Sequence, residues 1–183
     1  MASVLIPLAA GFEELEAVTI IDLLVRAGVE VTSAGLTPGP LKATRGVVLV
    51  PDTDLDTALQ RQYDMVVLPG GLPGAKALEA DPRIRTLLQQ MHASGRYTAA
   101  ICAAPRVLAA AGLLDGRTAT SYPGILDQAL PPGAQYSDQA VVQDGSVVTS
   151  RGPGTAMDFA LYLIELLVGK AKRDEVEAGL VRP

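Results

Sequence analysis

The sequence of 183 residues predicts an open α/β sandwich, in which a mainly parallel sheet carries an antiparallel hairpin at one side. One observation is a series of short, continuous apolar runs, which are typical of strands buried on both faces. Another is their order: an apolar run at residues 4–8, a helical pattern and a second apolar run at residues 29–34 form a βαβ unit, which implies parallel pairing. We expect one domain over residues 1–183, because no linker or repeat interrupts the pattern.

The first helix is predicted over residues 12–27. Acidic residues stand in its first turns, Arg26 lies in its last turn, and Gly28 follows as the C-terminal stop. On a helical projection, one mainly polar stripe holds Leu15, Thr19, Asp22 and Arg26, and almost all other positions are apolar. We therefore expect this helix to be covered on most of its sides.

Proline and glycine punctuate the segments that follow. The pattern predicts a turn at residues 36–41, an apolar strand at 46–50 and a short polar helix or turn at 54–62. Residues 64–69 form another apolar strand, which runs directly into a glycine-rich loop at 70–74.

The middle of the chain carries strong helix signals. A helix over residues 82–93 begins at an Asp-Pro pair and ends before Gly95. An apolar strand at residues 97–101 follows, and a run of helix formers at 106–111 predicts the next helix.

The last third of the chain mixes short strands and helices. A short strand is predicted at residues 118–121, and segments 140–142 and 146–149 flank an Asp-Gly turn, which indicates a hairpin. A helix over residues 155–168 starts at a threonine cap and ends before a glycine. Residues 172–178 add a final helical turn or two.

The composition excludes several classes of protein. The net charge is -5 and the basic residues are scattered, which argues against a nucleic-acid surface. No stretch approaches the ~20 apolar residues of a membrane span. One cysteine and one histidine, His92, exclude an internal disulfide and a Cys/His zinc site. We therefore expect a cytoplasmic protein without a metal or another cofactor.

The only cysteine, Cys102, lies where the predicted strand at residues 97–101 turns into the next helix. A side chain at this junction stands at the carboxyl end of a strand, near the positive end of a helix, and this position suits a nucleophilic thiolate. The alternative interpretation is structural, since free cysteines are often buried as small hydrophobic residues.

Backbone amides near Cys102 can stabilise negative charge. Sites in parallel sheets form outside the carboxyl ends of the strands, where the loop with Gly70 and Gly71 also lies. The amides of these glycines and of Ala103 can hold a thiolate or an oxyanion. Taken alone, the glycine pair also fits an ordinary turn. The glycine-rich run matches no phosphate-binding motif, so we expect no nucleotide.

The proton partner of the cysteine is sought among acidic residues. His92 is predicted late in a polar helix, where it suits the helix dipole, so a Cys-His-acid triad is nearly excluded. Glu13, Glu14 and Glu16 open the first helix, and they can simply favour its dipole. Glu13 and Glu16 also project toward apolar neighbours, where a buried carboxyl would stay protonated and donate a hydrogen bond to a thiolate. The projection makes Glu13 the more central, but spacing does not settle which one faces the sulfur.

Four segments together resemble the ThiJ/PfpI superfamily, the DJ-one/PfpI family, in the branch of the parkinsonism-associated protein deglycase and bacterial YajL-like proteins. They are Gly-Phe-Glu-Glu-Leu-Glu at residues 11–16, Leu-Pro-Gly-Gly at 68–71, Ala-Ala-Ile-Cys-Ala-Ala-Pro at 99–105, and residues 149–155. The resemblance runs nearly end to end. It implies a flavodoxin-like three-layer sandwich with helices on both faces of the sheet, similar to class I glutamine amidotransferases.

The resemblance also implies roles for single residues. Cys102 is expected to be the nucleophile, and Glu16 rather than Glu13 is its protonated partner. The amides of Gly71 and Ala103 are expected to form a small anion pocket.

Five residues are candidates for the lining of the substrate site. Arg45 and Arg26 match basic residues near the pocket of family members, the latter from across a dimer, and Arg151 matches an arginine in a loop behind it. Tyr122 stands where several members have a histidine, so a histidine base is not implied here. Glu13 completes this set.

The resemblance implies a cofactor-independent glyoxalase or deglycase that acts on methylglyoxal, glyoxal or their early adducts on proteins. The alternative is an oxidative-stress sensor or redox-regulated chaperone, in which Cys102 is oxidised to a sulfinate. A third alternative is a fold member without strong activity. The expected partners are a small dicarbonyl or a glycated protein and a second copy in a homodimer, with no membrane and no specific nucleic acid.

Overall fold

The computed structural model describes residues 1–128 and 130–182, and its centre is a seven-stranded sheet. The strands of this sheet are β1 (Ser3–Leu8), β2 (Glu30–Gly35), β5 (Thr53–Asp54), β6 (Met65–Leu68), β7 (Tyr97–Ile101), β10 (Val141–Asp144) and β11 (Val147–Ser150). Their order is β10-β11-β7-β6-β1-β2-β5. Every neighbouring pair is parallel except β10 and β11, which form the predicted hairpin at one edge.

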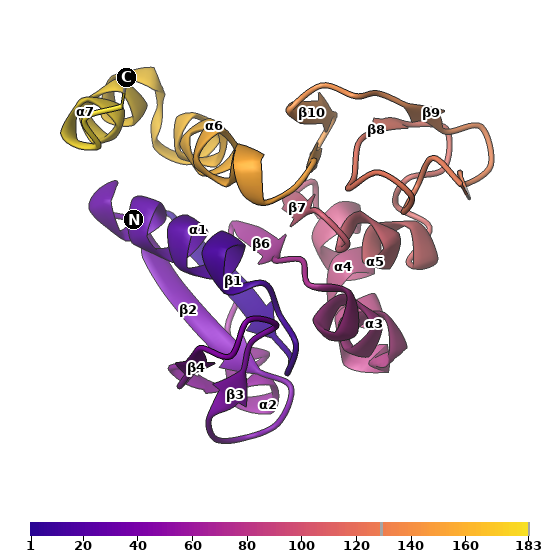
Figure 1. Ribbon diagram of the computed structural model, residues 1–183, viewed down its shortest axis with the longest axis horizontal. Helices are drawn as coiled ribbons and strands as arrows, with labels where there is room; N and C mark the ends of the chain where they lie inside the picture. The colour runs from indigo at the N-terminus through magenta and orange to yellow at the C-terminus, as the bar shows by residue number, and fades with distance from the viewer. Residues whose placement is uncertain (129, 183) are drawn as a thin grey trace.

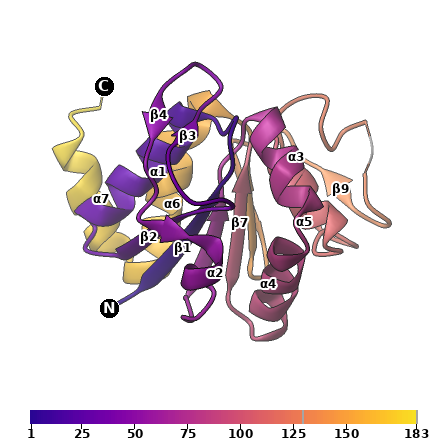
Figure 2. The same cartoon turned by 90° about the horizontal axis from the view of Figure 1, so that it is seen from below.

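Helices cover both faces of the sheet. They are α1 (Glu14–Arg26), α2 (Leu55–Ala58), α3 (Leu72–Ala80), α4 (Pro82–Ala93), α5 (Pro105–Ala110), α6 (Ala156–Val168) and α7 (Lys170–Gly179), with a 3-10 turn η1 (Pro153–Thr155) before α6. Helices α1, α6 and α7 lie on one face, and α3, α4 and α5 lie on the other (Figures 1 and 2). The flavodoxin-like three-layer sandwich is confirmed.

The central strands owe their places to their apolar runs. All four residues of β6 are buried, as are the last five of β1, because helices cover both faces of these strands. The predicted limits of α4 and β7 are confirmed. Asp81 caps α4, since its carboxylate accepts a hydrogen bond from the Arg83 amide at 2.9 Å.

The segment at residues 46–50 differs from its prediction as a strand. Only β4 (Val48–Leu49) is extended, and it pairs with β3 (Leu41–Lys42) in a separate antiparallel ribbon. Val47, Val48 and Val50 are exposed in this chain. An apolar run predicts burial only if another element covers it, and no element of the described residues covers these valines.

Helix α3 was not predicted from the sequence, because a proline and a glycine follow its first residue. Pro73 stands in the first turn, where its missing N–H costs nothing. Gly74 is required by packing, since a Cβ atom there would lie 2.8 Å from the Phe12 nitrogen. A short parallel pair, β8 (Thr118–Ala119) and β9 (Gln135–Tyr136), also lies outside the main sheet, and β9 was not predicted.

Two helix predictions need correction. Helix α1 is less covered than expected, because Val18 and Val25 are exposed. Thr155 stands at the start of α6, but its hydroxyl makes no capping hydrogen bond with the helix. It bonds instead with the Ser150 hydroxyl at 2.7 Å.

Among the helices of the described residues, none is long and apolar enough to cross a membrane.

Candidate active site

Cys102 occupies a sharp turn between β7 and α5. Its φ of 64° is in the left-handed region, which non-glycine residues rarely adopt because of a cost of roughly 1–2 kcal/mol. Two backbone hydrogen bonds hold this conformation: the Cys102 amide donates to the Ser150 carbonyl at 3.0 Å, and the Tyr122 amide donates to the Cys102 carbonyl at 2.9 Å. The surrounding chain thus fixes the direction of the thiol.

Gly70 brings the cysteine and Glu16 together. A Cβ atom at Gly70 would lie 2.6 Å from Cys102 Cβ, 3.0 Å from Cys102 Sγ and 2.6 Å from Glu16 Oε2, so both side chains lie against its Cα. Gly71 has φ +86°, and a Cβ atom there would lie 2.3 Å from the Gly11 carbonyl oxygen. Only glycine fits these two positions.

Glu16 is a fully buried carboxyl group on the first turn of α1. Burial raises its pKa to about 7, although hydrogen bonds from the Cys102 thiol and the Gly70 amide oppose this shift. The Gly70 amide donates to Oε2 at 2.7 Å. Oε1 is buried and finds no partner of normal hydrogen-bond geometry among the described residues. A carboxyl with this pKa can both accept and donate a proton near neutral pH.

The thiol of Cys102 is only 9% exposed, and burial is the main reason that its pKa rises to about 12. The charge of Glu16 and its hydrogen bond raise this pKa further, whereas hydrogen bonds from the Gly71 and Ala103 amides lower it. The sequence predicts an acidic thiol, whereas the structure gives a raised pKa. The helix start and the amides near Cys102 can be predicted from the sequence, but the burial of the thiol cannot. Since the Glu16 charge acts only while Glu16 is ionised, the two groups titrate as a pair.

Glu13 does not face the sulfur. It precedes α1 with φ -85° and ψ 110°, so a helical projection does not describe its direction. Its carboxylate accepts a hydrogen bond from the Thr44 hydroxyl at 2.9 Å. The projection that favoured Glu13 over Glu16 is therefore wrong.

The arginines of the predicted site lie in different places. Arg26 pairs with Asp22 at 2.7 Å near the far end of α1, roughly 15 Å along the helix axis from Glu16. Within a single chain it does not reach the cysteine. Arg45 is exposed on the loop that precedes β4, and its amide donates to Glu14 at 2.9 Å.

Tyr122 and Arg151 do come together. They line an open hollow of about 230 Å³ beside the Cys102 turn. The hollow adjoins that turn because the Tyr122 amide bonds to the Cys102 carbonyl. The guanidinium of Arg151 also donates a hydrogen bond to the Asp138 carbonyl at 3.1 Å. Arg151 still lines the hollow.

Glu14 has a structural role that the sequence did not reveal. Its carboxylate accepts hydrogen bonds from the Thr44 hydroxyl at 3.0 Å and from the amides of Arg45 and Val47 at 2.9 and 3.4 Å. Desolvation raises the pKa of Glu14, but these hydrogen bonds outweigh it and hold the pKa below its usual value. Glu14 thus ties the loop at residues 44–47 to the start of α1.

Comparisons with known proteins show which family and which relatives this chain is similar to. A family model described as the DJ-1/PfpI family matches residues 2–166. Protein dj-1beta of Drosophila melanogaster is 45% identical over 180 residues, which are 98% of this chain and 96% of that protein. Glutathione-independent glyoxalase DJR-1.2 of Caenorhabditis elegans is 38% identical over 164 residues, 90% of this chain and 87% of that protein. The crystal structure of Drosophila melanogaster DJ-1beta has a TM-score of 0.95 at 44% identity and covers 100% of this chain and 98% of that one.

Proposed function

Since the chain belongs to the DJ-1/PfpI family, we propose that it is a cofactor-independent enzyme that converts methylglyoxal or glyoxal to a hydroxy acid, or removes their early adducts from proteins. The observation that supports this proposal is the convergence of a thiol, a carboxyl of pKa about 7 and two amide donors, from Cys102, Glu16, Gly71 and Ala103. One relative is itself named a glutathione-independent glyoxalase.

The first step is addition of the Cys102 sulfur to the aldehyde carbon of the dicarbonyl. The S–C bond forms as the thiol proton passes to the Glu16 carboxylate, so a high thiol pKa does not prevent attack. The aldehyde oxygen becomes an oxyanion, which the amides of Gly71 and Ala103 stabilise before it is protonated to a hemithioacetal.

The second step moves a proton between two carbons. Glu16 removes the proton from the former aldehyde carbon and returns one to the neighbouring carbonyl carbon, while the hydroxyl proton of the hemithioacetal passes to the oxygen of that carbonyl. The first carbon is thereby oxidised to a thioester and the second is reduced to an alcohol, with no external oxidant. Water then hydrolyses the thioester, which releases the hydroxy acid and restores the thiol. In an early adduct, the sulfur instead displaces the protein amine: the S–C bond forms as the C–N bond breaks, the amine leaves with the thiol proton, and the same hemithioacetal results.

The decisive experiment measures the loss of methylglyoxal and the formation of lactate, with chelator present and glutathione absent. We expect saturable turnover by the wild type, none by Cys102→Ser, and a fall of roughly 10²–10⁴-fold in kcat for Glu16→Gln. Glu175→Gln on α7 is the matched control, because it makes the same chemical change at an exposed ion pair. Turnover that survives both site changes would refute the proposed mechanism.

A second candidate function uses the same two amides, which can hold the oxygens of a sulfinate as well as an oxyanion. In this redox sensor, two equivalents of peroxide oxidise Cys102 to the sulfinate and leave as water. Mild peroxide is then expected to add two oxygen atoms to Cys102. Oxidation of the methionines before Cys102 would count against the sensor.

We also propose that the protein forms a homodimer. Exposed apolar side chains on α1 and on the neighbouring β3–β4 ribbon support this proposal, because a second copy can cover them. Such an interface also offers a route by which Arg26 of one chain approaches the cysteine of the other.

A further inference from the structure

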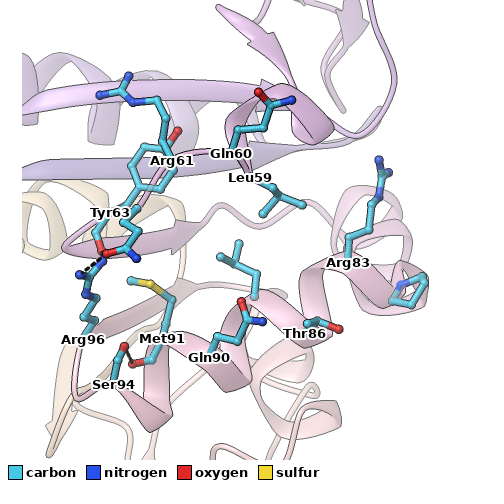
Figure 3. A pocket seen from close by; sticks show the side chains of 13 residues that line it. Leu59, Gln60, Arg61, Tyr63, Arg83, Thr86, Gln90, Met91, Ser94 and Arg96 are labelled. Carbon is cyan, nitrogen blue, oxygen red and sulfur yellow. Dashed lines mark hydrogen bonds between the residues drawn. The ribbon is translucent and has the colours of Figure 1, made fainter.

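A large groove lies between residues 59–63 and α4, and Figure 3 shows the side chains that line it. Its volume of about 810 Å³ falls in the range of small-molecule sites. The groove is separate from the cysteine site. Tyr63 and Arg96 precede β6 and β7, at the amino ends of these strands, whereas Cys102 follows the carboxyl end of β7, roughly 16 Å away along the strand.

The floor of the groove is apolar and its rim is polar. Leu59, Leu87 and Met91 supply aliphatic and thioether surface from both walls. Leu87 and Met91 are packed in the core, so their positions are already fixed. The rim carries uncharged amides and hydroxyls, among them Gln90 and Thr86. A ligand that fits both parts has an apolar body and one polar end.

The charged side chains that line the groove are all basic, in a chain whose net charge is -5. Its lining holds three arginines and no aspartate or glutamate. Two of the three are neutralised by ion pairs: Arg83 bonds to Asp81 and Asp56, and Arg61 bonds to Glu30.

Arg96 is the arginine whose charge remains unbalanced. Its guanidinium donates to the Tyr63 carbonyl at 2.7 Å and to the Gln62 side-chain oxygen at 2.9 Å, and both acceptors are neutral. It makes no ion pair with any residue of the described ranges 1–128 and 130–182. These two bonds hold the planar group in place and leave three of its five N–H donors for another acceptor.

We propose that this groove binds an amphipathic carboxylate, such as a medium-chain acyl acid. The acyl chain lies along Leu59, Leu87 and Met91, and the carboxylate meets the guanidinium of Arg96. A charge-assisted hydrogen bond from a preorganised arginine fixes the polar end, and burial of the chain supplies affinity. The site is independent of Cys102.

The test uses a fluorescent probe, 11-(dansylamino)undecanoate, displaced by decanoate. We expect saturable binding at one site per chain, and displacement by 1-decanol that is weaker by roughly 10-fold or more because the alcohol lacks the charge. Arg96→Gln is expected to weaken decanoate by a similar factor. Arg85→Gln is the matched control, since Arg85 is an exposed residue of α4 outside the groove.

A second variant guards against a folding defect in Arg96→Gln. Thr86→Trp places a large ring in the groove and leaves Arg96 intact, and it is expected to block the probe while methylglyoxal turnover and the melting temperature stay near wild type. The proposal is overturned if the probe does not bind, if decanol competes as well as decanoate, or if both groove variants bind like the control.

Discussion

At the scale of single residues, the proposed chemistry depends on two groups that share one buried space. Glu16 and Cys102 both pack against the Cα of Gly70. Glu16 raises the pKa of Cys102, and Cys102 lowers the pKa of Glu16. Because both are largely removed from water, the state with two negative charges is strongly disfavoured. A proton therefore stays within the pair at neutral pH and is available for transfer.

This coupling predicts a shift in thiol reactivity. Glu16→Gln removes the carboxylate charge that raises the pKa of Cys102, so we expect the pKa to fall. The rate of alkylation by iodoacetamide, measured from pH 6 to 11, is the readout. The variant then alkylates faster at a given alkaline pH while its turnover is lower. Glu175→Gln is expected to follow the wild type, and an unchanged or higher thiol pKa in Glu16→Gln would contradict the coupling.

The same carboxyl predicts how stability depends on pH. The folded pKa of Glu16, about 7, is above its usual value of 4.5, so the folded state binds this proton more tightly than the unfolded state. The stabilisation is fully present below pH 4.5 and is lost as pH rises through 7, by about 3 kcal/mol. Urea denaturation at pH 5 and pH 8 measures it. Glu16→Gln should lack this component, and an identical pH dependence in both proteins would disprove it.

At the scale of elements, the start of α1 organises one side of the site. Glu14 binds the loop at residues 44–47, which carries Arg45, while Glu16 on the same turn contacts the Gly70 amide. The helices α3 and α5 begin beside Cys102, next to Gly71 and Ala103, whose amides lower the pKa of the thiol. Three helix starts therefore converge on one thiol.

The contact between Glu14 and the loop predicts local protection. Glu14→Gln replaces a carboxylate acceptor by a weaker neutral one, so the amides of Arg45 and Val47 should exchange with solvent several-fold faster. In the wild type, the low pKa of Glu14 means that this protection persists above that pKa and declines as pH falls through it. Amide hydrogen exchange followed by NMR measures both effects. Equal exchange in Glu14→Gln and in Glu175→Gln would rule out this role.

At the scale of the whole molecule, several exposed apolar side chains lie on α1 and the β3–β4 ribbon. If a second copy covers this surface, Val18→Asp should convert a dimer into a monomer, because a buried charge without a partner is costly. Light scattering on a sizing column gives the mass directly. Val181→Asp, an exposed position near the C-terminus, is the control and should stay dimeric. A monomeric wild type would end the proposal.

Much of the fold could be predicted because local signals agreed with it. The apolar run in β1, the Asp-Pro start of α4 and the hairpin between β10 and β11 each depend on residues close in sequence. The strand-to-helix junction at Cys102 could be predicted for the same reason, because it also depends on residues close in sequence. The roles assigned to the site residues remain predictions for the variants above to test.

The sequence by itself determined the α/β class, the parallel βαβ unit at residues 4–34 and the place of Cys102 at the end of a strand, because periodicity and helix caps are local properties. The helical pattern left Glu13 and Glu16 open and the family resemblance favoured Glu16, whereas only the tertiary structure showed the contact between Glu16 and Gly70, the exposure of β4 and the burial of the thiol. These outcomes depend on residues far apart along the chain, such as Glu16 and Gly70, which are 54 positions apart. Distant contacts of this kind leave no periodic signal in a single sequence.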